Sequence, residues 1–248
     1  MRREDETFSF ASRIVWQSEG LVLVDKPAGV LSQPGSEGPN LVDLARAHFR
    51  QDAVAVLHRL DRNVSGLVML ATRKTEARAM SEAFAKGDVD RRYVAIVRGV
   101  PEAQTAIDAW LDKDASRNLV RARASAELSD ADREQFVAAL TEVRLEARFS
   151  ALFGRGAIVE ARPITGRSHQ IRVHLAFVGL PIVGDVKYGL AVRGIDRPLL
   201  HAREIRFTHP TTREPVAVRV AEPWSLEAVR TARAFAKKKH GHGSRPRG

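Results

Sequence analysis

The segment His58–Gly66 reads His-Arg-Leu-Asp-Arg-Asn-Val-Ser-Gly and separates two apolar runs, at residues 53–57 and 67–71. The second run is continuous, which predicts a buried strand. Asp61 is the only acid of the segment and has arginines close on both sides. A lone carboxylate in a basic loop predicts a nucleophile or base that meets a polyanion. The alternative is an aspartate that turns the chain and pairs with a neighbouring arginine, and the loop by itself favours neither.

Outward from this segment, apolar periodicity and breaker residues predict short elements. We expect strands at 14–16, 21–24, 67–71, 89–97, 205–207 and 216–220, and helices at about 40–50, 74–85 and 168–178. Asn40 and Thr72 are expected to cap the first two helices, and Gly87 to end the second. Strands outnumber helices and are joined by turns as often as by helices. This favours an α+β fold over a doubly wound parallel sheet.

Residues 112–141 are the hardest stretch to interpret. Residues 112–123 are charged and loop-like, and Ser129 is expected to cap a short helix that runs through Leu140.

The length and composition are those of a globular chain. Its 248 residues fit one large domain or two small ones, and 44% are hydrophobic. Cysteine is absent, which excludes disulfides and thiolate metal sites and suits a reducing cytoplasm. Met1–Phe10 has no apolar core typical of a signal peptide, and no apolar run approaches the roughly 18 residues of a membrane helix. We therefore expect a cytoplasmic protein with no membrane association.

The net charge of +10 favours a polyanionic partner. Lysines and arginines put +6 into residues 233–248, where there is no acid, and leave +4 for the rest of the chain. This tail also lacks an apolar period, so we expect it to be disordered. Two roles stay open for it: solubility, or non-specific attraction of RNA.

Further strings accompany the Asp61 segment. Residues 162–175 read Arg-Pro-Ile-Thr-Gly-Arg-Ser-His-Gln-Ile-Arg-Val-His-Leu, residues 179–189 read Gly-Leu-Pro-Ile-Val-Gly-Asp-Val-Lys-Tyr-Gly, and residues 91–93 read Arg-Arg-Tyr. Together, and in their order along the chain between about Val15 and Pro223, these strings resemble the RluA-type pseudouridine synthases. Those enzymes isomerise uridine in ribosomal or transfer RNA.

The resemblance implies a mixed, mostly antiparallel central sheet flanked by helices and loops. It implies a catalytic domain at 13–232, preceded by an extension at 1–12 and followed by the basic tail at 233–248. Residues 112–141 depart from the family's compact strand pair and are interpreted as an insertion or a divergent arm. Many members carry an N-terminal S4 RNA-binding domain, and we expect none here because the signature begins close to Met1.

The resemblance also implies the catalytic residues. Asp61 matches the carboxylate that acts as nucleophile or base, by attack on the sugar, attack on the ring or a glycal route. Arg172 matches its basic partner, and the alternative is a helix arginine that faces solvent. Tyr93 matches a stacking surface for a flipped uracil, and the alternative is a core tyrosine. Arg91 stands where the family usually has lysine.

RNA contacts are expected around this centre. Arg59 is expected to fill or brace the gap left by an extruded base, and His58 to orient the loop. The full set of expected RNA-binding residues is His58, Arg59, Arg62, Arg91, Arg167, His169, Gln170 and Ile171. Asn63 and Val64 depart from the family's acid and threonine, and Val64 lacks the hydroxyl of a threonine.

Other interpretations were weighed. A protein of the same fold that binds RNA without catalysis is the main alternative to an isomerase. A glycosidase needs two acids, and these strings offer no obvious general acid. Ser65 has no nucleophile elbow around it. His169 and His174 do not share a helical face well enough for a metal, so we expect no metal and no cofactor. The expected partner is a structured stem-loop of ribosomal or transfer RNA, bound by a monomer with no obligate protein partner.

Overall fold

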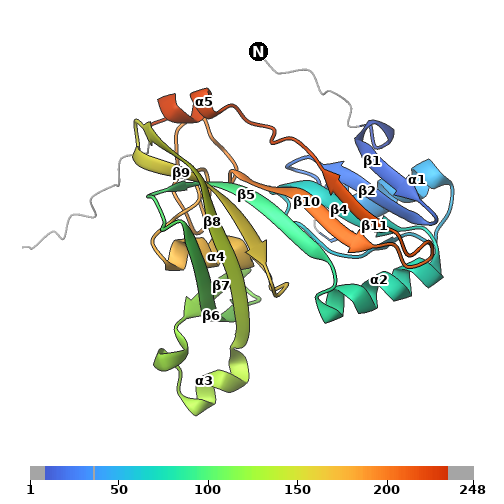
Figure 1. The fold of residues 1–248 in the computed structure, drawn as a ribbon, viewed down its shortest axis with the longest axis horizontal. Helices are drawn as coiled ribbons and strands as arrows, with labels where there is room; N and C mark the ends of the chain where they lie inside the picture. The colour runs from blue at the N-terminus through green and yellow to red at the C-terminus, as the bar shows by residue number, and fades with distance from the viewer. Residues whose placement is uncertain (1–8, 36, 234–248) are drawn as a thin grey trace, which may run out of the picture.

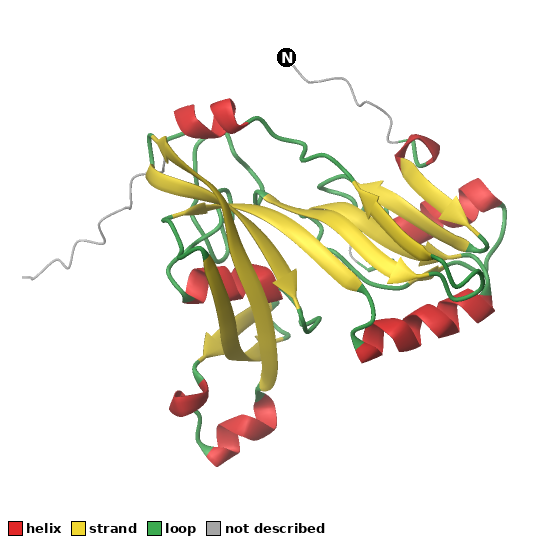
Figure 2. Ribbon diagram, viewed as in Figure 1, coloured by secondary structure: helices red, strands yellow, loops and turns green. Residues whose placement is uncertain are grey.

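The computed structural model describes residues 9–35 and 37–233, so most of the basic tail and of the N-terminal extension lies outside the described residues (Figure 1). The described part is built on one large sheet that runs the length of the molecule (Figure 2). Its strands are β1 (Ile14–Ser18), β2 (Leu21–Lys26), β3 (Ala55–Val56), β4 (Ser65–Ala71), β5 (Asp90–Arg98), β6 (Gln104–Asp114), β7 (Leu119–Arg123), β8 (Val137–Ala151), β9 (Gly154–Pro163), β10 (Leu200–Thr208) and β11 (Pro215–Arg219).

The strand order is β1-β2-β4-β10-β5-β9-β8-β6-β7, with β3 also paired to β4 and β11 to β10. Only the β4–β10 pair is parallel, and the other named pairs are antiparallel. The predicted α+β fold with a mixed, mostly antiparallel sheet is confirmed.

Helices cover both faces of the sheet. They are α1 (Leu41–Phe49), α2 (Lys74–Lys86), α3 (Asp130–Gln135), α4 (Gln170–Phe177) and α5 (Leu226–Thr231), with short 3₁₀ turns at Ala11–Arg13 and Ser125–Glu127. Side chains of α1 and α4 join the core on one face, and Met80 of α2 joins the core on the other. In the described part of the chain, no helix is long and apolar enough to cross a membrane.

The helix ends follow local chemistry. The Asn40 side chain accepts the N–H of Asp43 at the start of α1, and Gly87 ends α2 in the left-handed conformation, as predicted. The predicted cap at Thr72 is wrong by one residue, because Arg73 occupies the cap position of α2 without a side-chain bond. The Thr72 hydroxyl bonds the Gly20 carbonyl instead.

The junction between β4 and β10 requires a glycine. Every residue of β4 is buried, as its continuous apolar run predicts. Gly66 has a φ of +112° and pairs with Ala202 of β10. A Cβ at position 66 would lie 2.3 Å from the Ala202 carbonyl oxygen, so no other residue fits without moving the backbone. This close approach brings the loop that carries Asp61 against the centre of the sheet.

Residues 112–141 differ from the sequence-based expectation. The supposed loop at 112–123 is mostly strand, since β6 and β7 form an antiparallel hairpin, here called the arm. Ser129 does cap α3, but α3 ends at Gln135 and Val137 already begins β8, so the helix through Leu140 is wrong. The buried residues of β6 alternate with more exposed ones, and charges on the outer face hid this two-residue period.

Candidate active site

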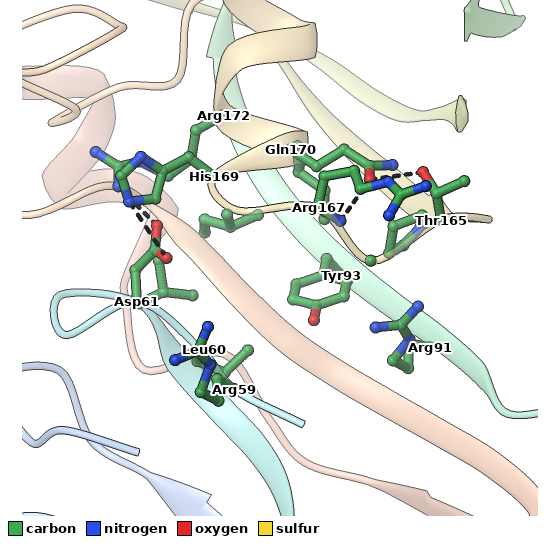
Figure 3. A pocket seen from close by; sticks show the side chains of 15 residues that line it. Arg59, Leu60, Asp61, Arg91, Tyr93, Thr165, Arg167, His169, Gln170 and Arg172 are labelled. Atoms are coloured by element: carbon green, nitrogen blue, oxygen red, sulfur yellow. Dashed lines mark hydrogen bonds and ion pairs between the residues drawn. The ribbon is translucent and has the colours of Figure 1, made fainter. Parts of the chain in front are cut away.

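A cavity of about 480 Å³ opens where the Asp61 loop, β5 and the start of α4 meet (Figure 3). The lining residues are Arg59, Leu60, Asp61, Val64, Arg91, Tyr93, Pro163, Thr165, Gly166, Arg167, His169, Gln170, Ile171, Arg172 and Leu200. They come from all three sequence strings singled out around Asp61, Tyr93 and Arg172, so the fold brings these strings together.

Asp61 and Arg172 form an ion pair inside this cavity. Arg172 donates from Nη1 to Asp61 Oδ2 at 2.7 Å, across 111 positions of sequence. Arg172 is 9% exposed, so the alternative of a helix arginine facing solvent is wrong. The Asp61 side chain keeps 27% exposure and stays accessible to a ligand. A turn in which Val64 N–H bonds the Asp61 carbonyl at 3.0 Å presents this carboxylate.

Asp185 is the second partner of Arg172, and sequence reasoning missed this role. Arg172 donates from Nε and Nη2 to the two oxygens of Asp185, at 2.7 and 2.8 Å. Asp185 is fully buried and also accepts the backbone N–H groups of Lys187 and Tyr188. Burial by itself would lower the pKa of Arg172, but the bonds to Asp185 and the charge of Asp61 raise it above its ordinary value. The guanidinium therefore stays charged.

His169 lies on the other side of Asp61. Its Nε2 is 3.8 Å from Asp61 Oδ1, and its Nδ1 is 2.6 Å from the hydroxyl of Tyr188. That hydroxyl also accepts the N–H of Val120 on the arm, at 2.9 Å. Burial lowers the pKa of His169, and the nearby Asp61 opposes the shift. Tyr188 is a second residue that sequence reasoning did not place in the site, although it lies in the quoted string at 179–189.

Tyr93 forms an aromatic surface of the cavity. It lies on β5 between β9 and β10 and is 6% exposed, and Figure 3 shows its ring between Asp61 and Arg91. Burial raises the pKa of its hydroxyl. The ring is at once part of the core and part of the cavity wall, and its stacking role stays a prediction. Leu60 and Leu200 add aliphatic surface beside it.

Two of the predicted RNA-binding residues support loops. Gln170 uses its amide within the protein: its oxygen accepts from Thr165 and the Arg167 N–H, and its nitrogen donates to the Leu140 carbonyl and to Thr141. His58 accepts the Met69 N–H on Nε2, as its predicted orienting role requires. Burial, aided by the charge of Arg91, lowers the pKa of His58 to about 3, so it is neutral.

Lys26 braces the Asp61 loop and was not predicted as a site residue. Its fully buried ammonium donates to the carbonyls of Pro27, Val30 and Arg62. Three acceptors match the three N–H groups of a protonated lysine. The bond to Arg62 ties down the residue that follows Asp61.

A groove of about 2280 Å³ adjoins the cavity and shares its wall. The cationic residues that line it are Arg59, Arg62, Arg91, Lys113, Arg167, Arg172 and Lys187. Lys113 belongs to the arm. Within the described residues, no group of three or more histidine, aspartate or glutamate side chains is arranged to hold a metal ion. His174 is fully buried and bonds Thr141.

Comparison with known proteins gives a consistent set of matches. A family model for RNA pseudouridylate synthase matches residues 20–177. The chain is 32% identical to ribosomal large subunit pseudouridine synthase D of Xanthomonas campestris pv. campestris, covering 88% of this chain and 68% of the relative. It is 31% identical to ribosomal large subunit pseudouridine synthase C of Vibrio vulnificus, covering 87% and 67%. The chain thus spans about two thirds of the length of these relatives.

Two solved structures match over about nine tenths of their own length. Human RNA pseudouridylate synthase domain containing 1 superposes with a TM-score of 0.71 at 25% identity, over 91% of this chain and 90% of that one. Human RNA pseudouridylate synthase domain containing 4 superposes with a TM-score of 0.70 at 24% identity, over 86% and 90%.

Proposed function

Because this chain belongs to the RNA pseudouridylate synthase family, we propose that Asp61 is the carboxylate with which it isomerises uridine to pseudouridine, and that its substrate is ribosomal RNA. The protein is an RNA pseudouridine synthase, and hence an isomerase. Its bacterial relatives named above are enzymes of the large ribosomal subunit, which supports ribosomal over transfer RNA.

The single observation that carries the role of Asp61 is its ion pair with Arg172 inside the cavity. The reaction breaks the C1′–N1 bond of uridine, turns the base and joins C1′ to C5, and the proton leaves C5 while N1 gains one. No redox step is involved. Arg172 bonds only Oδ2 of Asp61, so Oδ1 is free to act on the ribose or the ring as nucleophile or base.

Asp185 matters for the charge of this centre. Its bidentate bond to Arg172 neutralises most of the guanidinium charge, so Asp61, Arg172 and Asp185 together carry one negative charge. Arg172 therefore holds Asp61 in place while the three groups together remain negatively charged. A carboxylate that keeps its charge can act as a nucleophile or base.

The cavity suits a single extruded base. Tyr93 offers a ring on which a pyrimidine can stack, which contributes roughly 1–3 kcal/mol. Arg59 and Arg91 line both the cavity and the basic groove. Arg91 Nε is buried and has no hydrogen-bond partner in the described part of the chain. As a lining residue Arg91 is placed for the target nucleotide, and the groove cations are placed for its neighbouring phosphates.

The test compares wild type with Asp61→Asn on ribosomal and transfer RNA transcripts that lack modification. Wild type is expected to convert uridine in ribosomal RNA. Asp61→Asn should give background yield and bind the same RNA within a few-fold. Asp52→Asn, an exposed acid before β4, serves as the matched control and should retain full yield.

Each part of the proposal has its own contradicting result. Substantial turnover by Asp61→Asn removes Asp61 from its role. Conversion of uridine in transfer RNA but not in ribosomal RNA contradicts the proposal that ribosomal RNA is the substrate. Binding of RNA by wild type without conversion of any uridine favours the catalytically inactive alternative.

A further inference from the structure

We propose that His169 is a positioning residue for Asp61: Tyr188 holds it as the Nε2–H tautomer, and this N–H faces the carboxylate oxygen that Arg172 does not bond. This inference rests on the proposed role of Asp61. It differs from the role that the sequence predicts for His169, which is direct contact with RNA.

The tautomer follows from the hydrogen bonds of Tyr188. Its hydroxyl accepts the Val120 N–H, because a backbone nitrogen can only donate. Within the described residues, the hydroxyl proton has one acceptor at hydrogen-bonding distance, His169 Nδ1 at 2.6 Å. The opposite arrangement, in which Nδ1–H donates to the hydroxyl, would leave the tyrosine proton without an acceptor among the described residues. It would also turn the lone pair of Nε2 toward the carboxylate of Asp61. The Nε2–H tautomer gives the tyrosine proton an acceptor and turns the Nε2–H toward the carboxylate of Asp61.

The backbone and its neighbours fix the imidazole in this place. His169 has a φ of +54°, in the left-handed region, at the position just before α4. A non-glycine residue there costs roughly 1 kcal/mol or more. The His169 side chain is only 10% exposed, and the Tyr188 ring also lies 5.0 Å from the Arg172 guanidinium carbon. Tyr188 therefore contacts both groups that surround Asp61.

The charges around the ring keep it neutral. Burial is the largest influence and lowers the pKa of His169. Arg172, Lys187 and Lys113 lower it further, and only Asp61 raises it. These groups come from α4, the loop after it, the arm and the Asp61 loop, which are the elements packed around the ring. A neutral donor orients a carboxylate without neutralising it.

The effect on Asp61 is one of orientation. The 3.8 Å between Nε2 and Oδ1 is too long for a hydrogen bond and short enough for attraction between the N–H dipole and the charge. Arg172 anchors Oδ2, and the N–H draws Oδ1 to a defined side. Without this second contact the carboxylate can turn about its Cβ–Cγ bond. Small misplacements of a reacting group cost up to about 100-fold in rate.

Variants at position 169 can separate two properties of the residue: how far its side-chain N–H extends, and how well its backbone tolerates the left-handed conformation. In His169→Gln the amide nitrogen can occupy the place of Nε2. In His169→Asn it reaches only the place of Nδ1, although asparagine tolerates the left-handed conformation better than glutamine does. His169→Leu removes the donor altogether. We measure the single-turnover rate constant and the dissociation constant for RNA, with Asp61→Asn as the background.

The rate constant of His169→Gln is expected to lie within about 3-fold of the wild-type value. The rate constants of His169→Asn and His169→Leu should lie about 10- to 100-fold below the wild-type value. All three variants should bind RNA with the wild-type dissociation constant. A merely structural role would rank Asn above Gln. That ranking, or a loss confined to RNA affinity, overturns the inference.

A second measurement does not depend on turnover. Long-range ¹⁵N–¹H spectra should show His169 of the wild-type protein as the Nε2–H tautomer, and Tyr188→Phe should give a mixture of tautomers. An Nδ1–H tautomer in wild type overturns the inference even if the enzyme is fully active. Conversely, full turnover by Asp61→Asn overturns the proposed function, whatever the spectra show.

Discussion

The two carboxylates on Arg172 are predicted to have opposite mutant phenotypes. Asp185→Asn replaces a fully buried carboxylate that takes two bonds of Arg172 and the N–H groups of Lys187 and Tyr188. Removing one partner of a buried ion pair costs about 3–5 kcal/mol. Arg172 keeps its bond to Asp61, so we expect the low end, about 3 kcal/mol. For a chain of this size that lowers Tm by roughly 6–12 °C.

Asp61→Asn should do the reverse. The Asp61 side chain is 27% exposed, and Arg172 keeps both bonds to Asp185, so the loss of stability should stay near or below about 1 kcal/mol. Pseudouridine yield should nevertheless fall to background. Asp185→Asn should keep some activity at temperatures where it is folded, because the carboxylate that reacts is still present.

The assay is equilibrium urea unfolding at neutral pH, with thermal melts and pseudouridine yield on the same samples. Glu82→Gln is the matched control, because its pair with Arg78 is an exposed ion pair between neighbouring turns of α2, worth well under about 1 kcal/mol. An Asp185→Asn protein as stable as this control would refute the reasoning. So would an Asp61→Asn protein that unfolds as readily as Asp185→Asn.

Three further outcomes are expected. Gly66→Ala should destabilise the protein by more than about 3 kcal/mol, since its Cβ would lie 2.3 Å from the Ala202 oxygen at a φ that disfavours alanine. His174 and His201 are fully buried, and burial lowers the pKa of each from 6.5 to about 4. The unfolded chain thus binds more protons between these values, so the unfolding free energy should fall as pH drops from 6.5 toward 4, by about 1.4 kcal/mol per pH unit for each histidine. RNA affinity should fall steeply with salt, and Arg167→Gln should reduce the slope of log K against log salt by about 1 without changing the modified uridine.

Each of these outcomes has a control. Gly154→Ala, where φ is also positive but nothing lies within 4 Å of the added Cβ, should cost much less than Gly66→Ala, and equal costs would contradict the steric argument. His174→Gln should reduce the slope of the unfolding free energy against pH by about 1.4 kcal/mol per pH unit, whatever its effect on absolute stability. A flat pH profile between 6.5 and 4 would mean that these histidines are charged when folded. A change of target uridine in Arg167→Gln would make Arg167 a specificity residue rather than a phosphate contact.

Local sequence determined those elements whose causes are local. The continuous apolar run at 67–71 predicted β4, and Asn40 and Gly87 predicted where α1 begins and α2 ends. The motif strings pointed to the residues that meet in the cavity, and Asp61, Tyr93 and Arg172 all lie there. The predictions of β4 and of the ends of α1 and α2 succeeded because periodicity and capping are properties of neighbouring residues.

Contacts between distant segments were decided by the tertiary structure. Asp185 lies in the quoted string at 179–189, and only the fold turns it toward Arg172. Tyr188 reaches Val120 across 68 positions of sequence and so joins the arm to the site. The arm itself was mistaken for a loop because charges on its outer face hid the alternation of its strands. Such contacts depend on strand order and register, which pair residues far apart in the chain and leave no periodic trace in the sequence around either partner.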